Sequence, residues 1–208
     1  MIPIVRPSVM SGKLQGLMAI NTDTTSNPFC QQEYTKSNSN SICKKCYSMS
    51  MLNTFRKNCV PSFKRNSDIL ASDGPITVPP INAAYVRFHG HGELINVKHF
   101  LNFCDIASAY PNTTFALWTK RIDIVRPNLD AVPDNMILVY SNPSIDNVMS
   151  KPPRGFHRVF NNVSESYTGE TNCTGQKCMD CLLCYKFDTT KRASNIYFPQ
   201  IFYIQNLF

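Results

Sequence analysis

Strand-like and helix-like segments alternate through the middle of the chain, and this alternation constrains the fold more than any other feature of the sequence. Alternating apolar residues predict strands in four segments, at 83–90, 113–120, 135–141 and 156–163. The amphipathic pattern at 96–110 predicts a helix between the first two of them. Strands separated by helical connections indicate βαβ units and a mostly parallel sheet. The chain has 208 residues, fewer than the ~250 of a complete eight-fold barrel. We therefore expect an α/β fold with a partial (β/α) barrel or an open sheet.

The flanking segments are predicted from weaker patterns. We expect 1–16 to be irregular, 17–23 to form a first strand and 24–46 to be a long loop. Four further elements are predicted: a helix broken at Pro61 in 47–70, a weak helix or turn in 122–130, a short helix in 144–151 and a strand in 195–208. The chain then divides into an α/β core at 1–165 and a Cys-rich metal-binding segment at 166–208, whose terminal strand packs on the core.

Composition indicates a cytoplasmic globular protein. Hydrophobic residues make up 43% and charged residues 17% of the chain, which allows a sizeable core. No apolar run is long enough to span a bilayer, and the N-terminus lacks the apolar core of a secretory signal. We therefore expect no membrane contact and a reducing cytoplasm. The net charge of +7 permits contact with nucleic acid, although surplus Lys and Arg also keep proteins soluble.

Four cysteines lie close together near the C-terminus: Cys173, Cys178, Cys181 and Cys184. In a reducing compartment such C-x-x-C spacings more often hold metal or carry redox chemistry than form disulfides. Four thiolates are the number that an all-cysteine zinc site or an iron–sulfur cluster requires. The tight spacing resembles ferredoxin segments more than a zinc ribbon, whose two knuckles are usually separated by a longer spacer. We therefore favour a 4Fe-4S cluster and keep zinc as the alternative metal.

A looser group consists of Cys30, Cys43 and Cys46. The last two form a C-x-x-C pair, whereas Cys30 is assigned to them by proximity. Three thiols leave one iron of a cubane cluster without a protein ligand, and an open coordination position is where chemistry can take place. Cys59 and Cys104 fall in predicted helices, and we interpret them as small buried hydrophobic residues.

Two histidines, His89 and His91, end the first of the four predicted strands, at the edge where α/β folds place sites. Their spacing on a strand would direct both side chains to one face. There they could bind metal, donate protons, contact substrate or form a hydrogen-bonded pair without a further role. Arg87 is expected to point to the same side. Lys120 and Arg121 end the next strand. They could hold a phosphate or a carboxylate, or they could simply be solvated residues at the strand end.

Several segments resemble a small bacteriophage protein family, the gene-product-eighty-eight-like family. They are SGKLQGLMAIN with the cysteines that follow it, VRFHGHGEL, AYPNTTFALWTKR and CTGQKCMDCLLCY, and the resemblance covers about residues 11–185. The order of segments is also similar to that of proteins related to radical S-adenosylmethionine (SAM) enzymes. In those proteins a cysteine cluster ending in Cys-Tyr follows the first strand.

The resemblance to radical SAM enzymes implies a partial barrel with a 4Fe-4S cluster at its mouth, ligated by Cys30, Cys43 and Cys46. In such enzymes SAM binds the fourth iron, and a Gly-Gly-Glu segment after the second strand holds the SAM amino group. Gly90, Gly92 and Glu93 match that segment. Together with Tyr47, His89 and His91 they are our candidates for the cofactor site. The C-terminal cysteines would hold an auxiliary cluster.

Two main hypotheses follow for function. The first is an iron–sulfur protein with one or two clusters that acts as a SAM-dependent radical enzyme on an unidentified substrate. The second is a non-catalytic phage accessory protein, in which clusters or zinc stabilise the fold and the basic surface binds nucleic acid or a host protein. A weaker interpretation is an electron-transfer module.

Overall fold

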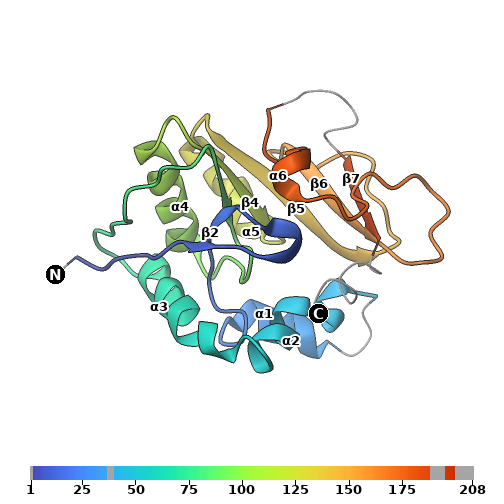
Figure 1. Ribbon diagram of the computed structural model, residues 1–208, viewed down its shortest axis with the longest axis horizontal. Coiled ribbons are helices and arrows are strands. Elements are labelled where there is room, and N and C mark those ends of the chain that lie inside the picture. The colour runs from blue at the N-terminus through green and yellow to red at the C-terminus, as the bar shows by residue number, and fades with distance from the viewer. Residues whose placement is uncertain (1, 37–39, 188–194, 200–208) are drawn as a thin grey trace.

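A seven-stranded sheet forms the centre of the molecule in the computed structural model, which describes residues 2–36, 40–187 and 195–199 (Figure 1). The strands are β1 (Ser8–Val9), β2 (Met18–Ile20), β3 (Tyr85–Phe88), β4 (Thr114–Thr119), β5 (Met136–Ile145), β6 (Arg158–Val163) and β7 (Asn195–Pro199). β1 is antiparallel to β2, and each later strand is parallel to its neighbour. The prediction of a mostly parallel α/β sheet is therefore confirmed.

The strands follow one another across the sheet in the order in which they occur along the chain. A doubly wound fold would instead reverse direction at a switch point. One-directional order with parallel pairing is the arrangement of barrel-type α/β proteins, and in the described residues the sheet stays open.

Short helices connect and cover the strands. The α-helices are α1 (Pro28–Thr35), α2 (Tyr47–Asn53), α3 (Val60–Ala71), α4 (Val97–Ala109), α5 (Ile122–Val125) and α6 (Cys178–Cys181). The 3₁₀ turns are η1 (Gly12–Leu14), η2 (Ile42–Lys45), η3 (Lys57–Cys59) and η4 (Arg126–Ala131). In Figure 1, α3 and α4 lie to one side of the sheet, whereas α6 lies over β6.

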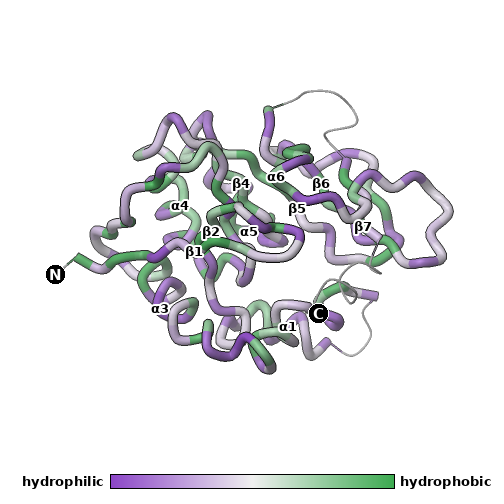
Figure 2. Tube along the Cα trace, viewed as in Figure 1, coloured by the Kyte–Doolittle hydropathy of each residue, from purple (hydrophilic) through white to green (hydrophobic). Residues whose placement is uncertain are grey.

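One face of the sheet is covered by helices and carries the main apolar core. Val86 and Phe88 of β3 pack there with the matching residues of β4 and β5, against Phe100 and Phe103 of α4. The Phe88 and Phe103 rings stack with their centroids 4.0 Å apart. Figure 2 shows the hydrophobic colour running through these central strands. Alternation along the strands thus places every second residue in this core.

The other face is covered by the Cys-rich C-terminal segment. Ala116 and Trp118 of β4 alternate with the core residues of that strand and pack against Tyr185, which is 1% exposed. Trp118 and Tyr185 have ring centroids 5.5 Å apart. The side chains of Cys178 and Cys184 pack against the same small cluster. Tyr185 therefore anchors the C-terminal cysteines to the sheet.

Several predicted boundaries need correction. The supposed loop at 24–46 contains α1, which begins because the Asn27 side chain caps it by accepting a hydrogen bond from the Cys30 N–H at 3.2 Å. Pro61 does not break a helix but lies in the first turn of α3, where its missing N–H costs nothing. The predicted helix at 144–151 is absent, because β5 continues to Ile145 and no helix follows it there. Residues 200–208 of the predicted terminal strand lie outside the described residues.

None of the helices in the described ranges is both long and apolar enough to cross a membrane.

Candidate functional site

A cavity of about 500 Å³ lies at the carboxyl ends of the parallel strands. Its wall includes Thr24 after β2, the segment 89–93 after β3, Lys120 after β4 and Asn162 in β6. This is the edge at which parallel sheets place ligand sites, and the volume suits a small molecule. Six cysteines line the same cavity: Cys30, Cys43, Cys46, Cys173, Cys178 and Cys184.

The first cysteine set, Cys30, Cys43 and Cys46, is drawn from two segments. Cys30 lies in the first turn of α1, and the Cys43 N–H donates to the Ser41 hydroxyl at 3.1 Å. Cys46 ends η2 and directly precedes α2. Two short helices therefore present the three thiols to one cavity.

A polar scaffold joins these helices to the segment after β3. The Asn27 side chain caps α1 and also donates to the Glu93 carbonyl at 2.8 Å. The Tyr47 hydroxyl, next to Cys46, donates to the Gly90 carbonyl. The buried Asp23 carboxylate accepts hydrogen bonds from four N–H and O–H groups of Thr25 and Ser26, which shape the turn before α1. The position of the first set is therefore fixed by groups outside it.

The three thiols are close enough to affect one another's pKa. Burial raises the pKa of the Cys30 thiol, as do Glu93, Cys46 and Cys43, whereas Lys120 opposes the rise. Burial also raises the pKa of Cys43, again against Lys120. The pKa of Lys120 is raised, because Cys43, Glu93, Cys46 and Cys30 outweigh its burial. One cation thus faces the whole first set.

The glycines of the segment 89–93 are required by contacts within the protein. Gly92 has φ of +96°, and a Cβ there would lie 1.9 Å from the Thr22 hydroxyl oxygen. A Cβ on Gly90 would lie 2.6 Å from the Asn21 side-chain oxygen. That oxygen accepts the His91 N–H at 2.9 Å. We predicted that these glycines allow close approach to a ligand; the close approach that the structure displays is to the chain after β2.

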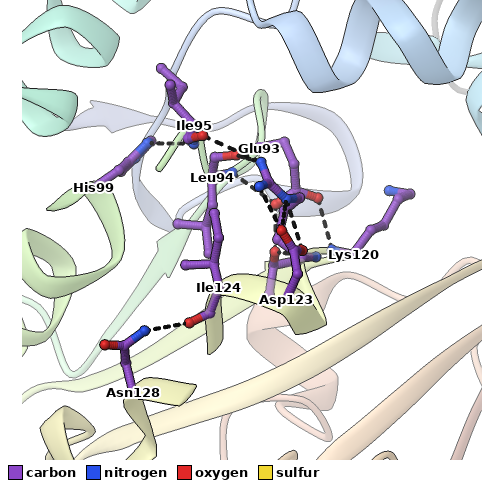
Figure 3. A network of polar contacts seen from close by, with 10 residues as sticks. Glu93, Leu94, Ile95, His99, Lys120, Asp123, Ile124 and Asn128 are labelled. Atoms are coloured by element: carbon purple, nitrogen blue, oxygen red, sulfur yellow. Dashed lines mark hydrogen bonds and ion pairs between the residues drawn. The ribbon is translucent and has the colours of Figure 1, made fainter. Parts of the chain in front are cut away.

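Glu93 is a buried carboxylate that organises the end of β4 (Figure 3). It accepts from the Leu94 N–H at 2.8 Å, the Thr119 hydroxyl at 2.5 Å and the Lys120 N–H at 2.8 Å. Figure 3 shows the side chain of Lys120 extending away from this network. A carboxylate has about four acceptor positions, so Glu93 retains little capacity for a further donor.

Arg121, a predicted anion ligand, is held in the same region by protein groups. Its guanidinium donates to Asp123 at 2.7 Å and to the Leu94 carbonyl at 3.0 Å. The hydrogen bonds from Arg121 lower the pKa of Asp123. The arrangement makes Arg121 a brace between β4 and the segment after β3.

The two histidines diverge, which corrects the prediction that they share a face. β3 ends at Phe88, and His89 has φ of +62°, so strand alternation does not extend to them. The Nδ1 of His89 lies 3.3 Å from the Trp118 carbonyl, whereas the Nδ1 of His91 lies 2.8 Å from the Ser48 hydroxyl. Both are 3% exposed, and burial lowers the pKa of each to about 3. Both are therefore neutral at pH 7.

The C-terminal cysteine set, Cys173, Cys178, Cys181 and Cys184, lies on one continuous segment around α6. Burial and the thiols of Cys173 and Cys181 raise the pKa of Cys178, whereas Arg87 and Lys13 lower it. The pKa of Cys184 is raised well above its ordinary value by burial and by the other three thiols. The four thiols therefore form a second neighbourhood, with Cys181 at its exposed edge.

Arg87 lines the same cavity and acts on the thiols of the C-terminal set. It belongs to β3 on the face of Trp118, and its guanidinium carbon is 3.8 Å from the centre of that ring. Its Nε donates to the His89 carbonyl at 3.1 Å. Lys13, which the sequence did not single out, donates to the Cys173 sulfur at 3.2 Å. No local pattern could have found this contact, because the two residues are 160 positions apart.

None of the nine cysteines, all within the described residues, is in a disulfide. Cys104 is buried in α4, as predicted, whereas Cys59 lies in η3 and is partly exposed. In the described part of the chain, no three His, Cys, Asp or Glu side chains are arranged to hold a single metal ion. The ligands of a cluster bind separate iron atoms, so a cluster requires thiols spread around a cavity.

Comparison with known proteins gives one match. No curated protein and no solved structure matches the chain. The family model described as "Gene product 88" matches residues 11–200, which include both cysteine sets and all of the cavity wall except Met10. This match confirms the resemblance to a bacteriophage gene-product family. The chain belongs to the gene product 88 family.

Proposed function

We propose that this chain is an iron–sulfur protein with a radical-SAM-like core. The first cysteine set holds one cubane cluster with an open iron, and the C-terminal set holds a second. The observation that carries the proposal is that six of these thiols, from three separate stretches of sequence, line one cavity at the carboxyl edge of a parallel sheet. A solely structural role for the thiols would not require them to face a common chamber.

The donor chemistry fits clusters in both sets. Thiolates are the preferred ligands of iron–sulfur clusters, and each set contains thiols that influence one another electrostatically. The raised pKa values favour protonated thiols in the metal-free chain, and metal binding displaces such protons. Lys120 beside the first set and Lys13 beside the C-terminal set offset the negative charge of thiolates.

The same geometry supports a SAM-like ligand at the first set. The segment 89–93 lies beside the three thiols, and the Tyr47 contact with Gly90 fixes its backbone. Lys120 reaches the same space and can meet a carboxylate. Glu93 acts here mainly as a positioning residue, because three protein donors already occupy its carboxylate.

When bound, a reduced cluster supplies one electron to a sulfonium, which starts radical chemistry. The chain contributes position and electrostatics. The wall includes the apolar side chains of Phe29, Trp118 and Phe160, which lower the polarity of the chamber. The buried, neutral His89 and His91 hold the loop without adding charge to it.

The first test is iron and sulfide analysis of anaerobically purified protein. We expect brown protein with iron and acid-labile sulfide, of which Cys43→Ala removes about half in this two-cluster scheme. Cys59→Ala is the matched control, because Cys59 is absent from the cavity wall. Colourless protein with stoichiometric zinc, or equal iron in both variants, would refute the proposal.

The second test separates an enzyme from a scaffold. We expect the reduced protein to bind SAM and cleave it to methionine and 5′-deoxyadenosine, and Cys43→Ala to abolish this cleavage. The C-terminal metal should remain in that variant. Cleavage that persists without Cys43 would contradict the assignment of the first set.

The net charge of +7 favours one alternative, an accessory protein that binds nucleic acid and uses its metal structurally. Exposed basic residues lie within and after the first set, among them Lys45, Lys57 and Arg65. Steeply salt-dependent binding of DNA or RNA, with no SAM cleavage, would favour this function. Salt-independent or absent binding would exclude it.

A further inference from the structure

We propose that the C-terminal cysteine set holds the higher-potential of two redox centres, so that an added electron rests there first. This inference rests on the proposed function, since it requires a cluster in each set. It goes beyond that function because it ranks the reduction potentials of the two centres. The ranking gives electron transfer between them a direction.

Hydrogen bonds to sulfur provide the first argument. Lys13 donates to the Cys173 sulfur at 3.2 Å, and the Gln176 amide lies 3.7 Å from the Cys181 sulfur. Reduction adds negative charge to the cluster and its thiolates. N–H groups aimed at the sulfurs stabilise that charge and raise the reduction potential.

Neighbouring charges provide the second argument. Two cations, Lys13 and Arg87, act on Cys173 and Cys178. Arg87 is fixed in place by the Trp118 ring and the His89 carbonyl, so its charge cannot move away. Stable positive charge beside a cluster favours its reduced state.

The first set has a different charge balance. Lys120 faces its three thiols, but the Glu93 carboxylate acts on Cys30 in the opposite direction. Glu93 is held in place by its three hydrogen bonds and cannot turn away. The other charged residues of the two motifs, Lys44, Lys45, Lys177 and Asp180, are exposed, so solvent screens their charges. Among the less exposed groups, a cation countered by a fixed anion stabilises added electrons less than two cations do.

Solvent exposure provides the third argument. Cys181 is exposed, whereas Cys30, Cys43 and Cys46 are partly buried. Water at the cluster edge stabilises the more negative state, and exposure is one of the factors that set cluster potentials. Burial of Cys184 acts in the other direction and lowers the reduction potential of the C-terminal centre. The two cations and the two hydrogen bonds to sulfur offset this effect.

The electron count is simple. Each cluster takes up one electron, and dithionite, the probe reductant, is oxidised to sulfite. The C-terminal centre is reduced first, and the first centre only at lower potential. An electron released into the chamber by substrate oxidation would therefore move to the C-terminal centre.

The test is an anaerobic redox titration followed by electron paramagnetic resonance. Cys43→Ala isolates the C-terminal centre, and Cys178→Ala isolates the first. We expect the midpoint potential of the isolated C-terminal centre to be the less negative of the two. The reverse order, or equal potentials, would overturn the inference.

Two charge variants assign the cause. Lys13→Gln and Arg87→Gln should each make the C-terminal midpoint more negative and leave the first centre nearly unchanged. Lys120→Gln should make the midpoint potential of the first centre more negative and leave that of the C-terminal centre nearly unchanged. Lys64→Gln, on the exposed surface of α3, should shift neither midpoint potential. Iron, sulfide and circular dichroism establish that each variant is folded and loaded. Unmoved midpoints in Lys13→Gln and Arg87→Gln would refute the electrostatic argument.

The outcome also separates this inference from the proposed function. Wild-type protein without iron and sulfide refutes both. Two clusters with the reverse order of potentials refute only the inference. A cluster confined to one set refutes the inference and reduces the proposed function to a single centre.

Discussion

The two cysteine sets reach the same cavity by different structural means. The C-terminal set lies on one short segment that is anchored to the sheet by the apolar contact of Tyr185 with Trp118. The first set is assembled from two segments by a polar scaffold, in which Asn27 and Tyr47 bind the loop after β3. Apolar burial tolerates small shifts in position, whereas hydrogen bonds and positive-φ glycines fix it. The first set therefore depends on the geometry of individual hydrogen bonds more than the aromatic anchor of the C-terminal set does.

The anchor of the C-terminal set gives the largest expected effect. Tyr185→Ala removes a ring that is 1% exposed. Loss of a buried aromatic side chain should lower the free energy of unfolding by about 3–5 kcal/mol. We expect iron to be lost from the C-terminal set before the first, as measured by urea unfolding and iron analysis. Tyr185→Phe keeps the ring and should cost less than about 1.5 kcal/mol; an equal loss in both variants would show that the anchor is not apolar packing.

Gly92→Ala should destabilise the first set instead of the C-terminal set. The new methyl group would meet Thr22 at 1.9 Å, in a backbone conformation with φ of +96°. We expect the unfolding free energy to fall by about 2–4 kcal/mol, because overpacking and backbone strain add. Iron should be lost from the first set and retained in the C-terminal set.

Gly74→Ala is the matched control for this prediction. Gly74 also has positive φ, of +106°, but nothing lies within 4 Å of a Cβ placed there. Its cost should be limited to backbone strain of about 1 kcal/mol. Equal losses in the two variants would attribute the Gly92 effect to backbone conformation instead of contact with Thr22.

Asn27→Ala should have a smaller effect on stability but a specific effect on the site. It removes the cap of α1 and the hydrogen bond to the Glu93 carbonyl. We expect the free energy of unfolding to fall by about 1–2 kcal/mol. Asn96→Ala removes a comparable cap from α4, where the side chain accepts the His99 N–H at 2.9 Å. We expect similar melting temperatures and a loss of first-set iron in Asn27→Ala only. Full iron in Asn27→Ala would show that the scaffold does not position Cys30.

The fold was predictable where periodicity was strong. The alternation at 113–120 and the amphipathic pattern at 96–110 correspond to β4 and α4. The prediction was wrong where a single side chain decides the structure. Asn27 starts α1 inside a stretch whose composition is typical of loops, and β5 extends to Ile145 because strand pairing with β6 outlasts its apolar alternation.

The cysteines themselves could be identified from their spacing, but their surroundings could not. Spacing along the chain predicts which thiols are near one another, and both sets line the cavity. The contact of Lys13 with Cys173 joins residues from opposite ends of the chain. The role of Gly92 was assigned to a ligand because a sequence does not reveal that the chain after β2 passes beside Gly92 at Thr22.

Acid provides an independent test of the difference between the two regions. Burial lowers the pKa of His89 and His91 to about 3, whereas histidine in an unfolded chain has a pKa of about 6.5. Below about pH 6.5 the unfolded chain therefore binds more protons than the folded one, so stability falls as pH falls, by at most about 1.4 kcal/mol per pH unit for each histidine. The loss continues until the folded protein is itself protonated, near pH 3.

Both histidines lie in the loop of the first set, so acid should loosen that region first. We expect amide hydrogen exchange at 89–93 to accelerate between about pH 6 and pH 4, while exchange at 182–186 changes little. His89→Gln should reduce the pH dependence of the unfolding free energy by about one proton. Within the described part of the chain, the rings in contact with Tyr185 are those of Tyr85 and Trp118, and neither gains a proton in this pH range. Simultaneous exchange in both regions would mean that the two sets open as one cooperative unit, and the contrast between a polar scaffold and an apolar anchor would then not govern their stability.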